Sequence, residues 1–138
     1  MKTLHVNIRV KDISESTRFY QELFGVAPSI EKADYVKWAL DEPQANFSIS
    51  LGKENFGVDH LGIEVSTSEE LHKLYQNMNA SEGDILEEGH TTCCYAQSEK
   101  SWVQDPQGVK WEAFHTYGES FVNKSEESAC CDESCCVA

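Results

Sequence analysis

Two segments of the chain alternate strictly between apolar and polar residues. The apolar positions are Val6, Ile8 and Val10 in the first segment and Leu61, Ile63 and Val65 in the second. A period of two, with mostly β-branched residues, predicts a strand that has one apolar and one polar face. A helix is expected to cover the apolar face, which leaves the polar face of each strand for other chemistry.

A helical pattern follows each of these strands. Asp12 stands three residues before Glu15, and Thr67 stands three residues before Glu70, which is the spacing of a capping box. Apolar residues then recur at helical spacing, at Phe19, Tyr20, Leu23 and Phe24 and at Leu71, Leu74, Tyr75 and Met78. Each strand is therefore expected to lead into an amphipathic helix.

Each helix is expected to lead into three short strands. Gly25 is placed to end the first helix, and Gly83 lies just beyond the second. Further strands are predicted near residues 27–31, 35–40 and 47–51, and near 85–88, 98–104 and 109–115. Each half then reads βαβββ, with module 1 at 1–52, module 2 at 58–118 and a mostly polar linker at Gly52–Val58.

The two halves also resemble each other in sequence. His5 and His60 occupy the same place in their alternating segments, and the segment at Trp38 matches the one at Trp102 with one extra residue in the first copy. The 138 residues suffice for one core but not for two, so the modules should share one sheet in an α+β fold. Equivalent residues then surround a pseudo-twofold axis, and the two histidines are expected to converge.

A buried carboxylate completes a candidate metal site. Glu112 lies in the middle of the last predicted strand, where a carboxylate is costly unless it is paired or bound to a metal. When the two halves of the sequence are aligned, Glu112 falls on Ile49 of the first half. It falls on Ser48 if the one-residue gap in the alignment is moved by one position, and neither residue is a good metal ligand. Two histidines in register and an in-strand glutamate together predict that His5, His60 and Glu112 bind a metal ion.

The six cysteines form three adjacent pairs, Cys93–Cys94, Cys130–Cys131 and Cys135–Cys136. Free thiols are expected in a reducing compartment, where thiolates bind soft ions. The first pair lies between two strands of module 2, and both thiols can hold one ion only if this segment is a loop or bulge. The alternative is a pair of small packed core residues. The tail pairs are also compatible with a zinc site, although they lack Cys-x2-Cys spacing.

Charge and the C-terminal segment narrow the possible partners. Eleven basic and 24 acidic residues give a formal net charge of −13, which argues against nucleic acid and anionic membranes. The chain has no long apolar run and no signal-peptide pattern, so a cytoplasmic location is expected.

Residues 119–138 contain few core-forming side chains and are predicted to be a flexible, acidic, cysteine-rich tail.

Over residues 1–118 the chain resembles the vicinal oxygen chelate superfamily, which includes glyoxalase I, bleomycin-resistance proteins and extradiol dioxygenases. The resemblance rests on His5, His60 and a Glu112 that follows an Asp-Pro-x-Gly turn. It implies a cupped mixed sheet of two modules around one metal ion. The carboxylate or amide of four-ligand members is absent near Ile49, which leaves the two-histidine, one-carboxylate set of non-haem Fe(II) oxygenases. Nickel, cobalt, manganese and zinc are the other ions expected to fit.

The Thr-Cys-Cys-Tyr segment at 92–95 resembles the carbon–arsenic lyase branch of that superfamily, which is related to proteins named as cadmium-induced. This implies Fe(II)- and O2-dependent cleavage of trivalent organoarsenicals such as methylarsenite, with release of arsenite. Cys93 and Cys94 would hold arsenic, and His90 and Tyr95 are candidate accessory residues. The tail cysteines would capture the arsenical and pass it inward, or take the arsenite product away. The alternatives are a non-enzymatic thiol protein that sequesters cadmium or arsenic, and an aromatic-ring extradiol dioxygenase.

Overall fold

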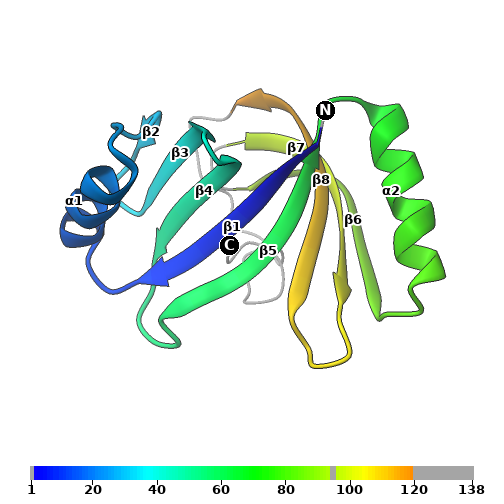
Figure 1. The fold of residues 1–138 in the computed structure, drawn as a ribbon. Coiled ribbons are helices and arrows are strands. Elements are labelled where there is room, and N and C mark those ends of the chain that lie inside the picture. Colours follow the sequence, from blue (N-terminus) through cyan, green and yellow to red (C-terminus); the bar gives the residue numbers. More distant parts are fainter. Residues whose placement is uncertain (1, 94–95, 120–138) are drawn as a thin grey trace.

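The computed structural model describes residues 2–93 and 96–119, with side chains described for 2–86 and 98–116. The predicted α+β fold class is confirmed: within these residues, eight strands form one mixed sheet, accompanied by two helices (Figure 1). The elements are β1 (Lys2–Val10), α1 (Ile13–Phe24), β2 (Ile30–Glu31), β3 (Tyr35–Asp41), β4 (Gln44–Leu51), β5 (Gly57–Val65), α2 (Ser68–Ala80), β6 (Ile85–Cys93), β7 (Ala96–Gln104) and β8 (Lys110–Glu119).

The order of strands across the sheet is β2-β3-β4-β1-β5-β8-β7-β6. β1 and β5 are antiparallel neighbours at the centre, and each has a parallel partner from its own half of the chain, β4 and β8 respectively. The strands of the first half of the chain therefore lie on one side of the β1–β5 contact, and those of the second half lie on the other. The helices flank opposite ends of the curved sheet (Figure 1).

Both helices begin at the predicted caps. The Asp12 carboxylate accepts a hydrogen bond from the Glu15 amide at 2.9 Å, and the Thr67 hydroxyl accepts one from the Glu70 amide at 3.1 Å. In α2 the Glu70 carboxylate also reaches back and accepts from the amide of Ser66, the residue before the cap, at 3.1 Å. Within the described ranges, neither helix combines the length and the apolar character needed to cross a membrane.

The helix ends differ from each other. Gly25 ends α1 in the left-handed conformation, with φ at 73°, as predicted. In α2 the cap is Ser81, which keeps a right-handed conformation and donates its hydroxyl to the Met78 carbonyl at 2.6 Å. Gly83 lies two residues beyond this cap, so it follows the second helix, as expected, but does not cap it.

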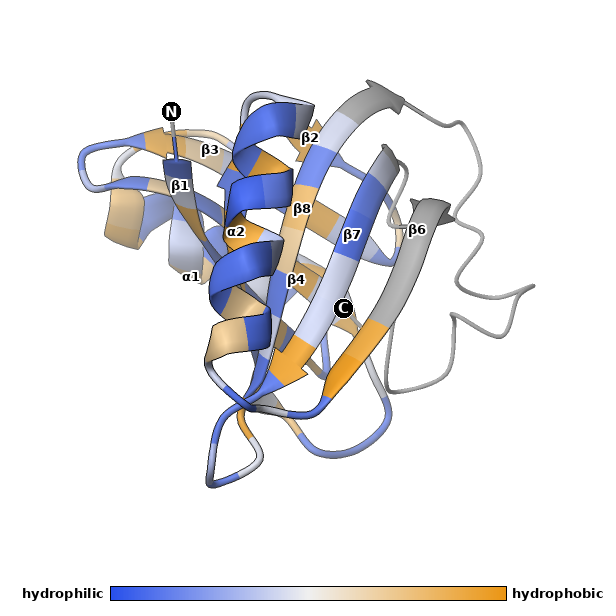
Figure 2. Cartoon of the chain, turned by 90° about the vertical axis from the view of Figure 1, so that its right-hand side faces the viewer, coloured by the Kyte–Doolittle hydropathy of each residue, from blue (hydrophilic) through white to orange (hydrophobic). Residues whose placement is uncertain are grey.

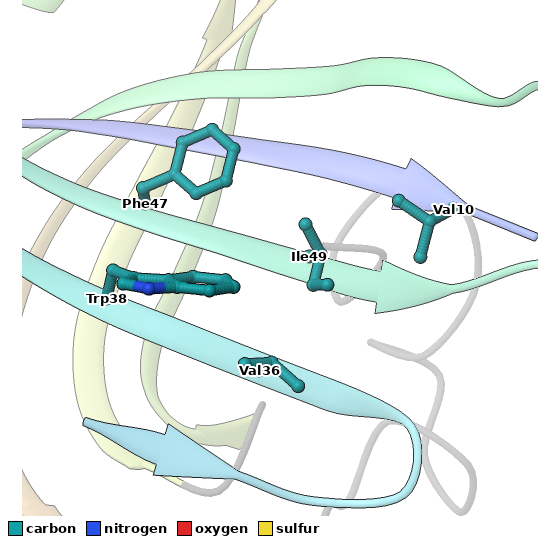
Figure 3. Close-up of a cluster of buried hydrophobic side chains, with 5 residues drawn as sticks. All are labelled: Val10, Val36, Trp38, Phe47 and Ile49. Carbon is teal, nitrogen blue, oxygen red and sulfur yellow. The ribbon is translucent and has the colours of Figure 1, made fainter. Parts of the chain in front are cut away.

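Each helix covers one hydrophobic cluster on the same outer face of the sheet. The cluster beside α1 consists of Val10, Val36, Trp38, Phe47 and Ile49, which project from β1, β3 and β4 (Figure 3). The cluster beside α2 consists of Val65, Leu71, Leu74, Met78 and Ala113. Mostly hydrophilic residues follow the outward side of α2 (Figure 2). The core thus occupies the helix-covered face and leaves the opposite face of the central strands free for polar groups.

The strand boundaries depart from the predicted ones in two ways. β2 has only two residues because it is an edge strand that pairs with β3 at Ile30 and Glu31 alone. The other strands are longer than predicted, since backbone pairing continues beyond the alternating segments. β5 begins at Gly57, inside the predicted linker.

The sequence match between Trp38 and Trp102 does not hold in space. Trp38 is fully buried in the cluster beside α1, whereas the Trp102 ring lies 5.0 Å from the ring of His60 on the opposite face. Strand register explains the difference. Trp38 stands opposite Phe47, and Val103 stands opposite Trp111, so Val103 is the counterpart of Trp38. A shift of one residue turns a side chain to the other face.

Register also decides which residue of the first module corresponds to Glu112. Asn7 of β1 pairs with Ser48 of β4, and Gly62 of β5 pairs with Glu112 of β8. Because Asn7 and Gly62 each lie two residues after their histidine, Ser48 is the counterpart of Glu112. Of the two possible alignments, the one that matches Glu112 with Ser48 is therefore correct. A serine thus stands where the four-ligand pattern has its additional ligand.

Candidate metal centre

The two predicted histidines meet on the inner face of the sheet, where β1 and β5 lie side by side. His5 pairs with Gly62 and His60 with Asn7, so both imidazoles project from adjacent strands toward one point. Their Nε2 atoms are 3.1 Å apart, and residues His5 and His60 are 7% and 1% exposed. The alternation of β1 and β5 brings the two side chains together, as the sequence repeat predicts.

Glu112 supplies a third donor atom from β8. Its Oε1 lies 3.5 Å from Nε2 of His60 and 3.8 Å from Nε2 of His5. Three atoms at these separations lie on a circle of about 2.0 Å radius, which matches the bond length of about 2.0–2.2 Å between a divalent metal ion and nitrogen or oxygen. The three side chains form the one group of potential metal ligands found within the described residues.

Gly62 makes this convergence possible and was not singled out from the sequence. A Cβ atom at this position would lie 2.8 Å from the Glu112 carbonyl oxygen, 3.2 Å from the Glu112 Cβ and 3.3 Å from Cδ2 of His5. A side chain here would force the strand of Glu112 or the ring of His5 outward. The only sequence signal for this role is a glycine inside an otherwise regular strand pattern.

The other ring nitrogen of each histidine is held by a hydrogen bond. Nδ1 of His5 lies 3.2 Å from the backbone carbonyl oxygen of Asn46, and Nδ1 of His60 lies 3.0 Å from the side-chain oxygen Oδ2 of Asp59. Each Nδ1–H therefore donates to an oxygen acceptor, which leaves the Nε2 lone pair for a metal ion. The donor set and its supporting hydrogen bonds fit a divalent cation.

Asp59 reaches its position through a β-bulge that sequence reasoning missed. Asn7 pairs with His60, but Ile8 pairs with Val58, so Asp59 is an additional residue in β5. The Asp59 carboxylate also accepts a hydrogen bond from Nη2 of Arg9 at 2.9 Å, and both side chains are buried. Arg9, Asp59 and His60 thus form a continuous buried chain of hydrogen bonds.

The electrostatics of the site favour an ionised Glu112 and a neutral His5. Burial opposes the charge on Glu112, but the Lys100 ammonium at 2.8 Å and the hydrogen bond from His60 outweigh it and lower the pKa of Glu112. Burial lowers the pKa of His5 to about 4. Burial also opposes protonation of His60, but hydrogen bonds to Asp59 and Glu112 raise the pKa of His60 above 6.5.

Aromatic rings enclose the site on two sides. Trp102 meets His60 edge to face with ring centroids 5.0 Å apart, and Phe114 meets His5 in the same way at 5.2 Å. In the first module, Asn7 donates its side-chain amide to the Ser48 hydroxyl at 2.8 Å, and both residues are fully buried. These side chains therefore shield the parts of His5 and His60 that face the sheet from water.

The predicted arsenic-binding residues stand at the far end of the β6–β7 hairpin. Cys93 is the last residue of β6 and pairs with Ala96, whereas Leu86 of β6 pairs with Trp102 beside the metal centre. The seven residue-to-residue steps from Leu86 to Cys93 span about 23 Å of strand. Cys94, Tyr95 and the tail cysteines Cys130, Cys131, Cys135 and Cys136 lie outside the described residues, as do the side chains of His90 and Cys93.

Comparisons with known proteins give a consistent picture. The sequence model of the Glyoxalase/Bleomycin resistance protein/Dioxygenase superfamily matches residues 2–113. The chain is 38% identical over 133 residues to a protein of Bacillus subtilis (strain 168) named "Probable trivalent organoarsenical cleaving enzyme", with 95% of this chain and 91% of that protein covered. It is likewise 38% identical over 135 residues to the trivalent organoarsenical cleaving enzyme of Bacillus sp. (strain MD1), with 95% and 83% covered.

Solved structures share the fold at low sequence identity. An extradiol ring-cleaving dioxygenase from B. fuscum superposes with a TM-score of 0.64 at 18% identity, over 83% of this chain and 32% of that one. At this identity the likeness concerns the fold alone.

Proposed function

We propose that this chain, which belongs to the Glyoxalase/Bleomycin resistance protein/Dioxygenase superfamily, cleaves the carbon–arsenic bond of trivalent organoarsenicals and releases arsenite. Fe(II) is the proposed metal and O2 the second substrate. The observation that carries the proposal is the convergence of two imidazole nitrogens and one carboxylate oxygen on a single point. The names of two relatives at 38% identity support the choice of substrate.

The three-donor set favours an oxygenase over a structural metal site. A structural zinc site uses four protein ligands, whereas two histidines and one carboxylate leave coordination positions open. The counterpart of Glu112 in the first module is Ser48, whose hydroxyl accepts a hydrogen bond from Asn7. Fe(II) bound to such a set supplies the activation of O2 that the reaction requires. Nickel, cobalt, manganese or zinc would fit the same donors.

The residues around the donors hold them ready for the ion. The Asn46 carbonyl and the Asp59 carboxylate fix the tautomer and the direction of His5 and His60, so that both rings present Nε2 inward. Trp102 and Phe114 limit the motion of the same rings and exclude water from one side. The chain thereby keeps the donors near their bound geometry without the ion.

The arsenic atom is proposed to be bound by the thiolates of Cys93 and Cys94. Trivalent arsenic is soft and thiophilic, and two adjacent thiols can hold it while its carbon substituent stays free. Since the register places Cys93 far along β6 from the level of Glu112, the hairpin must bend over the inner face to bring the substrate to the metal. His90 and Tyr95 belong to the same segment and are proposed to assist there. Reduced thiols are kept in the cytoplasm, which is the expected location.

The deciding experiment is anaerobic reconstitution with Fe(II), addition of methylarsenite, and then exposure to air. Oxygen uptake and arsenic speciation are followed together, and the expected result is arsenite release that requires both iron and O2. A Glu112→Gln protein is the control, because it keeps the shape of the side chain and removes the anionic ligand.

The same experiment separates the competing functions. Tight arsenical binding without oxygen uptake or arsenite release would indicate a sequestering thiol protein. Oxygen uptake with a catechol, but none with methylarsenite, would indicate an aromatic-ring dioxygenase. Either result would contradict the proposed lyase activity.

A further inference from the structure

Lys100 is a buried cation that contacts a proposed metal ligand. It lies on β7, next to β8, and its side chain is 7% exposed. Its Nζ is 2.8 Å from Oε2 of Glu112 and 6.0 Å from the centre of the Trp102 ring. A buried lysine is rare in proteins unless it is paired, so its placement at this carboxylate calls for a reason.

The two oxygens of Glu112 have different surroundings. Oε1 faces the two imidazoles, at 3.5 Å from His60 and 3.8 Å from His5. Oε2 faces the ammonium of Lys100 at 2.8 Å, a distance typical of a charge-assisted hydrogen bond. One oxygen is thus directed to the metal position and the other is held by an ammonium group.

We propose that Lys100 is a positioning residue that restricts Glu112 to ligation through Oε1 alone, so that the bound metal ion keeps an additional open position. The inference rests on the proposed metal site at His5, His60 and Glu112. A free carboxylate can ligate through one oxygen or two. Ligation through both would occupy the position that an incoming ligand needs.

The location of Lys100 keeps it in this role when a metal ion binds. Both members of the pair are nearly inaccessible to solvent, at 7% and 5% exposure of their side chains. Separating a buried ion pair in a poorly solvated site is strongly unfavourable. Oε2 therefore stays bound to the ammonium while Oε1 turns toward the ion.

A second consequence concerns the charge of the ligand that enters the open position. The ammonium adds a positive charge beside the ion, and at short range in a buried site such a charge favours an anion over a neutral molecule. The open position should therefore bind small anions such as azide more tightly with Lys100 present than without it.

The test uses the full-length protein loaded with Co(II), in wild type, Lys100→Met and Lys100→Arg. Crystal structures give the distance from each Glu112 oxygen to the ion, and azide titration followed by visible absorption gives the affinity of the open position. Lys73→Met is the matched control, because Lys73 is exposed on α2. Thermal melts establish that each variant is folded.

In the wild type, Oε1 is expected within about 2.0–2.2 Å of Co(II), with Oε2 still on Lys100. In Lys100→Met, both oxygens should bind the ion, and azide affinity should fall at least about tenfold, because the open position and the neighbouring positive charge are both lost. Lys100→Arg and Lys73→Met should behave as the wild type. Should Lys100→Met fail to fold, the structures of the wild type and of Lys100→Arg still show whether Glu112 binds the ion through one oxygen or two.

Three outcomes would overturn the inference, and they distinguish its failure from failure of the metal site. Ligation through both oxygens in the wild type, or unchanged azide affinity in a folded Lys100→Met, would contradict the role of Lys100 and leave the proposed metal site intact. Failure of wild-type protein to bind Co(II) at His5, His60 and Glu112 would contradict the metal site itself and the inference with it.

Discussion

Asp59 and His60 are adjacent in β5, yet their side chains meet, with Oδ2 of Asp59 3.0 Å from Nδ1 of His60. Neighbours in a regular strand point to opposite faces. The β-bulge between the pairs Asn7–His60 and Ile8–Val58 places both side chains on the inner face. The bulge therefore gives His60 an anionic hydrogen-bond acceptor that holds its ring with Nε2 toward the proposed metal ion.

Replacing Asp59 with asparagine should weaken metal binding about 10–100-fold, the range found for partners of metal-bound histidines. The variant keeps the size of the side chain but loses the charge that fixes the His60 tautomer. Calorimetric titration with Co(II) measures the effect. Asp41→Asn, at an exposed position at the end of β3, is the control. An unchanged affinity in Asp59→Asn would show that the bulge serves packing alone.

Gly62→Ala should lower metal affinity and destabilise the fold by about 1–3 kcal/mol, the usual cost of an overpacked interior. The new Cβ would lie 2.8 Å from the Glu112 carbonyl oxygen and 3.3 Å from His5, so the strand and the ring must separate. Co(II) titration and chemical denaturation of the metal-free protein measure the two effects. Loss of stability with full metal affinity would mean that only packing depends on this glycine.

Metal binding should release a proton and strengthen as the pH rises. His5, with a pKa of about 4, is already neutral at pH 6, whereas the pKa of His60 is raised above 6.5 by Asp59 and Glu112. A metal ion must displace the His60 proton, so affinity should climb about tenfold per pH unit below that pKa and level off above it. Titration calorimetry in two buffers of different ionisation enthalpy counts the proton. A flat profile between pH 5 and 6.5 would contradict this protonation state.

Cys93→Ser and Cys94→Ser should each cripple arsenical binding while Fe(II) or Co(II) affinity is unchanged. Serine nearly preserves size but replaces a soft thiolate with a hydroxyl that binds trivalent arsenic poorly. In the wild type, arsenical binding should also fade as the pH falls well below the thiol pKa. Both affinities are measured on the same protein samples. Full organoarsenical turnover in both variants would refute the proposed role of the pair.

Truncation after Glu119 should leave turnover measurable at high substrate concentration. The tail cysteines Cys130, Cys131, Cys135 and Cys136 are proposed to capture arsenical, so the effect should be confined to low substrate concentration and appear as a raised KM. Steady-state kinetics of the truncated and full-length proteins make the comparison. Complete loss of activity would instead assign these cysteines to the active site.

Local pattern sufficed for the helices and most strands. The capping boxes at Asp12 and Thr67 and the alternation through β1 and β5 act within a few residues, and the structure follows them. The extent of the strands was predicted less well, because pairing partners from distant parts of the chain decide where a ladder ends. β2 is short because only two of its residues find partners in β3.

Repeat symmetry and strand parity made the three proposed ligands recognisable in the sequence. His5 and His60 share a position in the repeat, and Glu112 is a carboxylate in an otherwise buried strand. The same symmetry misled at Trp102, where one residue of register separates the core face from the inner face. Sequence similarity alone does not fix register, whereas hydrogen-bonded pairing does.

The sequence by itself determined the residue types, their order and the face that each alternating apolar segment turns to the core, since alternation and capping are properties of neighbouring residues. Only the tertiary structure decided the supporting contacts of Asp59, Gly62 and Lys100. Asp59 depends on a bulge against β1, Gly62 on the close approach of β8, and Lys100 on the pairing of β7 with β8. Each depends on backbone contacts between segments far apart in the chain, and no local pattern encodes those contacts.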